Sequence, residues 1–360
     1  MSDPAPQRRQ RRSRSQGPSL AKRIGVGLLI VGGFAASGGI GAGIYFLPAI
    51  KTAFNSLGQN AGYAPTSTAD VSAVASPGAT PAPTARPFPS GGAVVGADQP
   101  FTMLLLGSDN DTKFGPSTGA VLTQSMILAR VDPAAKTVVM LSIPRDLYVP
   151  LSSGGTDKID KAYLHGGAQA AIDTVQNNFR VRIDHWAWIG LEGLIKLIDQ
   201  VGGIDIVATN PVIDDYYPAD LTAANPFNFH RVFTVPGPQH LDGMLAMEYV
   251  RSRHGDLRGD FGRSARQQQV LLALRAKSKL LSFANLPDIA ATIDSEFKTD
   301  VALTSVTNLL PLAGSIPLSS VTQVVLGPPY TSSEVIGSQD VLIPNWNLIR
   351  GVVSQYFPIS

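Results

Sequence analysis

The chain has 360 residues and a mass of 38.0 kDa, which suffices for one large domain with flanking segments or for two small domains. Its formal net charge is only +2, and it has no cysteine, which excludes a disulfide framework, a zinc–thiolate site and a cysteine nucleophile. Its five scattered histidines argue against a histidine-rich metal cluster.

The first 50 residues contain a basic run followed by an uncharged apolar stretch. The basic residues are Arg8, Arg9, Arg11, Arg12, Arg14, Lys22 and Arg23, and residues 24–50 carry no charge. Roughly 20 apolar residues are enough for a membrane-spanning helix, and flanking positive charge stays on the cytoplasmic side. We therefore predict a cytoplasmic tail (1–23) and one transmembrane helix (24–50) that places the rest of the chain outside the cell. The alternative is a cleaved signal peptide, but the apolar run is long for one and no clean cleavage site follows it.

Residues 51–99 form the predicted extracellular linker. From residue 64 onwards Pro, Ala, Ser, Thr and Gly dominate, and the apolar residues show no period. This composition is typical of a partly extended stalk without a core of its own. The folded domain is therefore expected over residues 100–360.

The domain begins with three predicted strands. Residues 101–106 are continuously apolar and lead into Asp109, which suits a buried strand that delivers a carboxylate at its C-terminal edge. Residues 126–131 and 137–143 flank a tight turn and are expected to pair antiparallel, which brings Gln124 near Arg145. If the first strand runs parallel to the third, Asp109 lies at the same edge.

The remainder alternates predicted helices and strands. Helices are expected over 165–179, 190–201, 241–248, 261–282, 289–297, 303–313 and 346–357. Strands are expected around Trp186 and Trp188 and over 203–208, 323–326 and 340–343. Residues 209–236 are predicted to be irregular, either as a flexible lip over a site or as a plain surface loop. This mixture predicts an α/β fold: a single three-layer α/β/α domain with a mixed central sheet.

Five arginines and two aspartates are concentrated over residues 249–268. Arg251 and Arg253 are two apart in a predicted extended segment, so their side chains should project to one side. Asp260 is a plausible N-cap of the next helix.

On that helix Arg263, Arg266 and Gln267 are spaced to share one face. Guanidinium groups gathered at a helix start suit an anion with paired oxygens, such as phosphate or pyrophosphate. The alternative is a solvated helix with internal Arg–Asp pairs.

Several motifs, in order, resemble the LytR-CpsA-Psr family of cell-wall glycopolymer transferases. They are LLLGSDN, MILARVDPAAKTVVMLSIPRDLYV, DKIDKAYLHGG, LIDQVGGIDI, PGPQHLDGMLAMEYVRSR and GDFGRSARQQQ. The resemblance covers about residues 101–274 well and the C-terminal part more loosely. It implies a membrane-anchored phosphotransferase that moves a glycan phosphate from a polyprenyl-pyrophosphate carrier to a peptidoglycan hydroxyl.

The resemblance also implies roles for individual residues. The pyrophosphate would be bound by Arg145, Lys158, Arg251, Arg253 and Arg263, with Gln267 orienting it. Asp109 would help hold Mg²⁺ beside the phosphates, and Asp260 would be an acidic partner that could act as base for the incoming hydroxyl. The lipid tail would occupy an apolar pocket between the sheet and the helices.

One stretch departs from the family pattern. The family usually carries an arginine and a magnesium-binding aspartate before the second strand, where this chain has Leu122 and Gln124. A neutral amide is a much weaker Mg²⁺ ligand than a carboxylate. The metal would then be held by Asp109 with substrate phosphates and water, or with Asp111 as a further ligand.

Three functions therefore remain open at this point. The first is the membrane-anchored phosphotransferase, and the second is a non-catalytic binder of polyprenyl-pyrophosphate lipids, which the Gln124 departure favours. The third is a transmembrane regulator of transcription. The short cytoplasmic tail leaves no room for a DNA-binding fold, so no nucleic-acid partner is expected.

Overall fold

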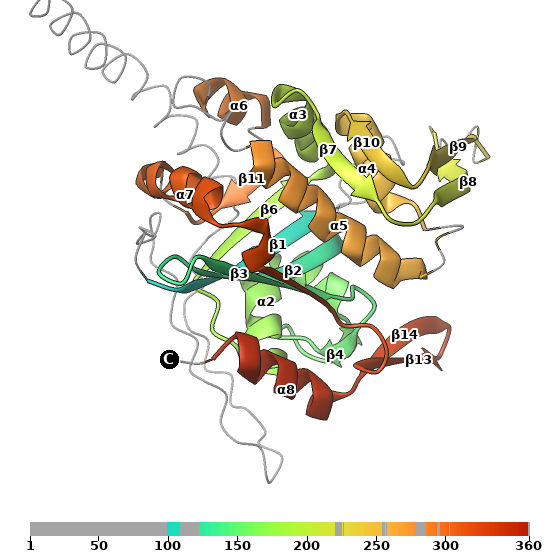
Figure 1. Ribbon diagram of the computed structural model, residues 1–360. Helices are drawn as coiled ribbons and strands as arrows, with labels where there is room; N and C mark the ends of the chain where they lie inside the picture. The colour runs from blue at the N-terminus through green and yellow to red at the C-terminus, as the bar shows by residue number, and fades with distance from the viewer. Residues whose placement is uncertain are drawn as a thin grey trace, which may run out of the picture. The chain divides into compact units, whose positions relative to one another are not determined.

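The computed structural model describes most of the predicted domain (Figure 1). The described residues are 99–108, 122–219, 225, 227–253, 256, 258–277, 286–293, 296–301 and 303–358. No helix within these ranges is both long and apolar enough to cross a bilayer. The predicted cytoplasmic tail and transmembrane helix, and the linker up to residue 98, lie outside the described residues.

A six-stranded sheet forms the middle layer, in the order β11–β6–β1–β2–β3–β12. The strands are β1 (Phe101–Ser108), β2 (Thr123–Asp132), β3 (Thr137–Ile143), β6 (His185–Gly190), β11 (Phe297–Thr299) and β12 (Val321–Val325). β2 pairs antiparallel with both β1 and β3, so β1 and β3 run parallel to each other. β6 is parallel to β1, β12 is parallel to β3, and β11 is antiparallel to β6. The predicted mixed sheet and its first three strands are confirmed.

Helices cover both faces of this sheet (Figure 1). On one face, α2 (Ala162–Phe179) and α8 (Trp346–Tyr356) pack against the buried strand residues Leu104, Leu128 and Leu141. On the other face lie α5 (Gly259–Ala276), α3 (Leu191–Gln200) and α4 (Gly243–Arg251). The buried Gln268 side chain of α5 donates hydrogen bonds to the Ser142 hydroxyl (2.8 Å) and the Val324 carbonyl (3.0 Å), which ties this helix to β3 and β12. The arrangement is three-layered, as the sequence predicts.

The alternation of side chains along β1 separates the core from the functional face. Leu104 and Leu106 belong to the core that α2 and α8 cover. Leu105 lies between its register partners Ile127 of β2 and Ala187 of β6, on the opposite face. Because successive strand residues point to opposite faces, the continuous apolar run supplies both a core and an apolar surface for the α5 side.

The smaller elements surround these layers. They are β4 (Tyr148–Pro150), β5 (Thr156–Lys158), η2 (Ile159–Lys161), β7 (Ile204–Ala208), β8 (Val212–Pro218), β9 (Phe229–Thr234), β10 (Gly237–Leu241), α6 (Leu286–Ile293), α7 (Leu303–Ser315), η5 (Leu318–Ser320), β13 (Thr331–Ile336) and β14 (Gln339–Pro344).

Two sequence predictions are wrong in this outer part. Residues 209–236 are not irregular, because β8 and β9 pair antiparallel there. The strand period was hidden because β8 buries a carboxylate, Asp214, beside Val212 while Ile213 is exposed. The helix predicted over 289–297 ends at Ile293, and Phe297 instead begins β11 at the sheet edge.

Candidate functional site

An apolar cavity of about 370 Å³ lies on the α5 side of the sheet. Its apolar lining comprises Leu105, Leu106, Ile127, Ala187, Trp188, Ile189, Leu191, Leu194, Leu197, Val250, Val270, Leu271, Leu274 and Phe297. These residues belong to β1, β2, β6, β11, α3, α4 and α5, so the sheet and three helices build the walls together. Trp188 lines the cavity from β6, while its ring stacks on Tyr163 of α2 in the core. The cavity can therefore enclose an apolar chain.

The same cavity also has a cationic lining. Its polar residues include Arg145, Arg251, Arg253 and Arg263 together with Gln124 and Gln267. No Asp or Glu lines it within the part of the chain that the structure describes. The structure thus brings together six residues that the sequence analysis singled out, from segments spread over more than half of the domain. An anion beside an apolar group is the ligand that this lining complements.

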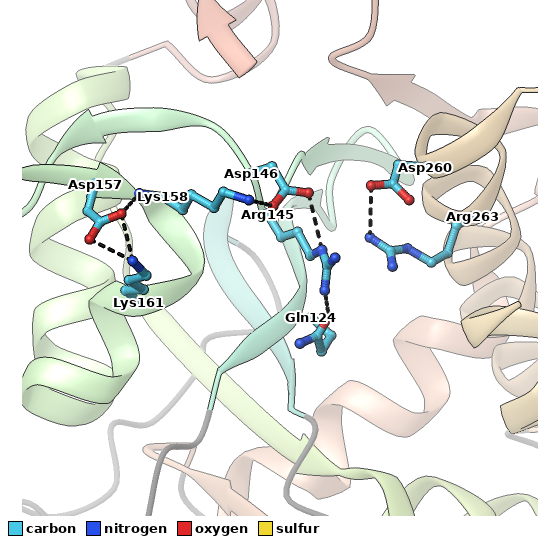
Figure 2. Close-up of polar contacts among 8 residues, drawn as sticks. All are labelled: Gln124, Arg145, Asp146, Asp157, Lys158, Lys161, Asp260 and Arg263. Carbon is cyan, nitrogen blue, oxygen red and sulfur yellow. Dashed lines mark hydrogen bonds and ion pairs between the residues drawn. The ribbon is translucent and has the colours of Figure 1, made fainter. Parts of the chain in front are cut away.

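Arg145 and Gln124 meet because β2 and β3 are antiparallel neighbours. Gln124 lies near the start of β2, and Arg145 follows the end of β3 at the same edge. A guanidinium N–H of Arg145 donates a hydrogen bond to Oε1 of Gln124, and its Nε donates to the Asp146 carboxylate at 3.3 Å (Figure 2). Two neighbours therefore fix the orientation of this arginine.

Arg251 and Arg253 reach the cavity from the end of α4. Contrary to prediction they do not share an extended segment, because Arg251 is the last residue of α4 and the helix stops at Ser252. The Arg251 guanidinium donates to the Tyr217 hydroxyl (3.4 Å), and the Arg253 backbone N–H donates to the Asp214 carboxylate (3.3 Å). β8 thus supports both arginines from behind.

α5 supplies Arg263 and Gln267, which are one helical turn apart. Asp260 is not the N-cap as predicted: the helix begins at Gly259, so Asp260 lies in the first turn. There its carboxylate lies 3.6 Å from Arg263 (Figure 2) and favourably near the positive end of the helix dipole.

Arg266 does not share the face of Arg263 and Gln267, which corrects a further prediction. Its guanidinium forms an ion pair with Asp256 at 2.9 Å and donates to the Tyr249 and Ser252 carbonyls. The buried Asp256 carboxylate packs over Gly262, where an added Cβ would lie only 2.3 Å from it. A buried acceptor outside the helix therefore directs Arg266 away from the cavity.

The electrostatics of the cavity favour a bound anion. Burial lowers the pKa of Arg263 to about 10, and the positive charges of Arg145 and Arg253 act in the same direction, while Asp260 opposes them. Within the described residues, Nε of Arg263 is buried without a hydrogen-bond partner. Several positive charges are thus held close together where they are poorly solvated, which costs free energy. A bound phosphate oxygen would lower this electrostatic cost.

Lys158 lies behind the arginines, outside the cavity lining. Its Nζ donates to the Asp146 carboxylate at 2.7 Å, so Lys158 and Arg145 share this partner (Figure 2). Burial opposes ionisation of Asp146, but the hydrogen bond from Lys158 and the charge of Arg145 outweigh it and lower its pKa. Lys158 therefore acts on Arg145 through Asp146.

The described residues do not by themselves fit a magnesium ion. They contain no group of three or more His, Asp or Glu side chains able to hold a metal. The amide oxygen of Gln124 accepts a hydrogen bond from Arg145. The predicted ligands Asp109 and Asp111 lie outside the described residues, so the magnesium prediction still depends on them.

The residues that support the arginines were not predicted from the sequence. Asp146 could have been noticed, because it directly follows Arg145 and an acidic neighbour often orients a guanidinium. Asp214 and Tyr217 gave no such signal, since their segment lacked a clear strand period. Their role depends on how β8 packs against α4.

The fold and the site together define a class of protein: an α/β/α domain with an apolar cavity whose polar lining includes four arginines. Within this class, the chain belongs to the LytR_cpsA_psr family, whose model matches residues 67–334. This confirms the family suggested by the motifs.

Several known proteins are similar to this chain. "Biofilm regulatory protein A" of Streptococcus mutans serotype c is 33% identical over 230 residues, which are 61% of this chain and 54% of that protein. "Polyisoprenyl-teichoic acid--peptidoglycan teichoic acid transferase TagV" of Bacillus subtilis strain 168 is 33% identical over 210 residues, 57% of this chain and 51% of that protein. The chain thus spans about half the length of these curated relatives. The crystal structure of B. subtilis TagV has a TM-score of 0.58 and 26% identity, covering 73% of this chain and 99% of that chain.

Proposed function

We propose that this protein is a membrane-anchored phosphotransferase acting outside the cell. It moves a glycopolymer phosphate from a polyprenyl-pyrophosphate carrier to a peptidoglycan hydroxyl. The single observation that carries this proposal is the cavity whose lining joins a long apolar wall to four arginines. The transferase activity named for the similar TagV protein supports the same substrate class.

The cavity divides the substrate into two parts. The apolar wall takes the polyprenyl tail, and the arginines take the pyrophosphate. The acceptor hydroxyl oxygen attacks the phosphorus that carries the glycan, the bond from that phosphorus to the bridging oxygen breaks, and polyprenyl phosphate leaves. Phosphoryl transfer of this kind needs positioning and charge neutralisation more than a covalent nucleophile. Arg145 and Arg263 neutralise the phosphate oxygens, and Asp260 receives the hydroxyl proton.

A transfer assay tests this proposal. The full chain would be reconstituted in vesicles that contain the lipid-linked glycan, and phosphodiester formation on added peptidoglycan would be measured. We expect Arg145→Ala to reduce transfer by roughly 100-fold or more, because a preorganised donor to a developing charge is removed. Arg182→Ala is the control, since Arg182 is 54% exposed and pairs with Asp184 away from the cavity. Equal losses in both variants would contradict the assignment.

The second candidate function is a non-catalytic binder of polyprenyl-pyrophosphate lipids. One observation favours it: the family's aspartate position holds Gln124, whose amide oxygen is bonded to Arg145. In the same assay, lipid retention that depends on Arg145, without product under any divalent cation, would establish the binder and exclude the transferase.

Gln124→Asp is expected to create a response to Mg²⁺ that the wild-type chain lacks or shows weakly. A carboxylate is the oxygen ligand that this hard cation prefers. At a concentration about 100-fold above the Kd, bound metal would raise the unfolding free energy by about 2.7 kcal/mol. Thermal unfolding with and without Mg²⁺ measures this effect without relying on activity. Gln124→Asn keeps a neutral amide and is the matched control. The same metal-dependent shift in all three proteins would show that residue 124 does not limit metal binding.

A further inference from the structure

The β8–β9 hairpin has an exposed aromatic face. All four exposed aromatic side chains of the described residues belong to it or directly precede β9, with Tyr216 64%, Phe227 80%, Phe229 39% and Phe233 67% exposed. Ile213, 49% exposed, lies opposite Phe233 in the strand register. The rings of Tyr216 and Phe229 meet edge to face at 6.1 Å. Because exposed aromatic residues are concentrated here, this is an interaction surface rather than scattered surface hydrophobicity. We call these five residues the aromatic face.

The opposite side of the same hairpin is buried and touches the functional site. Val212, Tyr217 and Val232 are each at most 5% exposed. Tyr217 accepts the hydrogen bond from Arg251, and the Asp214 carboxylate accepts from the Arg253 backbone. The hairpin lies beside α4 and β10 at one end of the domain (Figure 1). The aromatic face and the residues that contact Arg251 and Arg253 therefore lie on opposite faces of the same two-stranded sheet.

We propose that the aromatic face inserts into the headgroup region of a phospholipid bilayer and docks the domain on the membrane. Aromatic side chains are favoured at this depth because their rings tolerate both apolar and polar surroundings. The charged side chains on the same face compensate each other, since Arg231 donates to Asp215. Arg231 and Asp215 can therefore enter the headgroup region as an ion pair, without either charge being left unpaired.

The rest of the chain favours a bilayer over a protein partner. The predicted anchor over 24–50 is followed by 49 residues, 51–99, before the domain. Because the predicted anchor and the domain belong to one chain, the anchor would keep a bilayer within reach of the domain, and this raises the effective concentration of lipid at its surface. A modest aromatic surface then suffices for docking.

Docking would also explain why the hairpin supports the arginines. If the aromatic face lies among the headgroups, Arg251 and Arg253 directly behind it lie near the depth of lipid phosphates. This orientation rests on the proposed transfer reaction, whereas the insertion rests on the aromatic face and the predicted anchor alone.

The absence of cysteine makes the insertion directly measurable. Phe233→Cys and Val335→Cys would each be labelled with an environment-sensitive fluorophore in the full chain and reconstituted in phosphatidylglycerol–phosphatidylcholine vesicles. Val335 is the matched control because it is equally exposed (66%) and also lies in a two-stranded hairpin, in β13. Nitroxide groups on the lipid acyl chains would serve as quenchers. We expect several-fold stronger quenching at position 233 than at position 335.

Equal quenching at the two positions would overturn the proposal. The proposal would also be overturned if, in the absence of lipid, the label at position 233 became less accessible to solvent as the protein concentration rose. A second copy of the chain would then cover the aromatic face.

A second arm tests the orientation separately. Phe229→Ser combined with Phe233→Ser should slow transfer from vesicle-embedded substrate several-fold and leave transfer from a short-chain, water-soluble substrate unchanged. An unchanged rate from vesicles would overturn the orientation. If the wild-type chain transfers from neither substrate, the proposed function is refuted. The quenching result would still decide whether the aromatic face inserts.

Discussion

Replacing Arg263 by methionine is expected to reduce transfer by roughly 10²–10³-fold, or about 3–4 kcal/mol of transition-state stabilisation, the usual effect of losing one preorganised donor. The same change should make the fold more stable. Arg263 is 7% exposed, and burial lowers its pKa from 12.5 to about 10, so the folded state holds its charge at a cost. At neutral pH the residue is charged in both states, and this cost is fully present. With about 1.4 kcal/mol per pKa unit, its removal would raise the unfolding free energy by up to about 3 kcal/mol.

The matched control is Arg266→Met, three residues further along the same helix. Arg266 is equally buried, at 6% exposed, and burial lowers its pKa as well, but its charge is compensated because it pairs with Asp256 at 2.9 Å and bonds two backbone carbonyls. Removing one partner of a buried pair leaves the other charge uncompensated and costs about 3–5 kcal/mol. Chemical denaturation should therefore move in opposite directions for the two variants. A destabilised Arg263→Met protein would mean that Arg263 supports the fold, and the case for it as a binding residue would fail.

This contrast also shows how far sequence could predict the site. Helical spacing placed Arg263, Arg266 and Gln267 on one face, which is correct for Arg263 and Gln267 only. Arg266 is directed by Asp256, whose side chain is only 4% exposed. The spacing of residues along a helix does not predict such a tertiary contact.

Proximity was predictable where it followed from strand pairing. The tight turn between β2 and β3 fixes an antiparallel register, and that register brings Gln124 to Arg145. Apolar runs likewise predicted the mixed sheet, because a strand buried on both faces must be apolar throughout.

The β8–β9 hairpin was missed because its core face carries Asp214 and its outer face carries aromatic residues, the reverse of the usual pattern. Such an inversion is expected where a strand supports a functional site.

Asp146 and Asp160 lie near each other, but their pKa values are shifted in opposite directions. Their contributions to fold stability should therefore depend on pH in opposite ways. Asp160 is 4% exposed in η2, and its Oδ1 has no hydrogen-bond partner within the described residues. Burial raises its pKa from 3.8 to about 6; the charge of Arg145 opposes this shift and that of Asp146 adds to it, while Lys158 and Lys161 are further opposing charges. Asp146 differs because it is the direct partner of Lys158 and Arg145, which lower its pKa.

Replacing Asp160 by asparagine is therefore expected to raise the unfolding free energy at neutral pH by about 1–3 kcal/mol. A carboxyl whose folded-state pKa exceeds its unfolded value stabilises the fold fully below the unfolded pKa and loses that contribution as pH rises through the folded pKa. For Asp160 the loss spans roughly pH 4 to 6 and reaches about 3 kcal/mol. The amide has the same shape without the charge, so the variant should lose this pH dependence. Denaturant unfolding at a series of pH values measures the difference.

Asp146→Asn is the control with the opposite sign. Its lowered pKa contributes stability above the unfolded value of 3.8 that is lost as pH falls through the folded pKa. The variant should thus be less stable than wild type at neutral pH, since Lys158 and Arg145 lose a charged partner, and the gap should close in acid. A parallel response of the two variants would show that Asp160 is ionised and stabilised in the fold like its neighbour, and the expected neutral-pH gain would then be wrong.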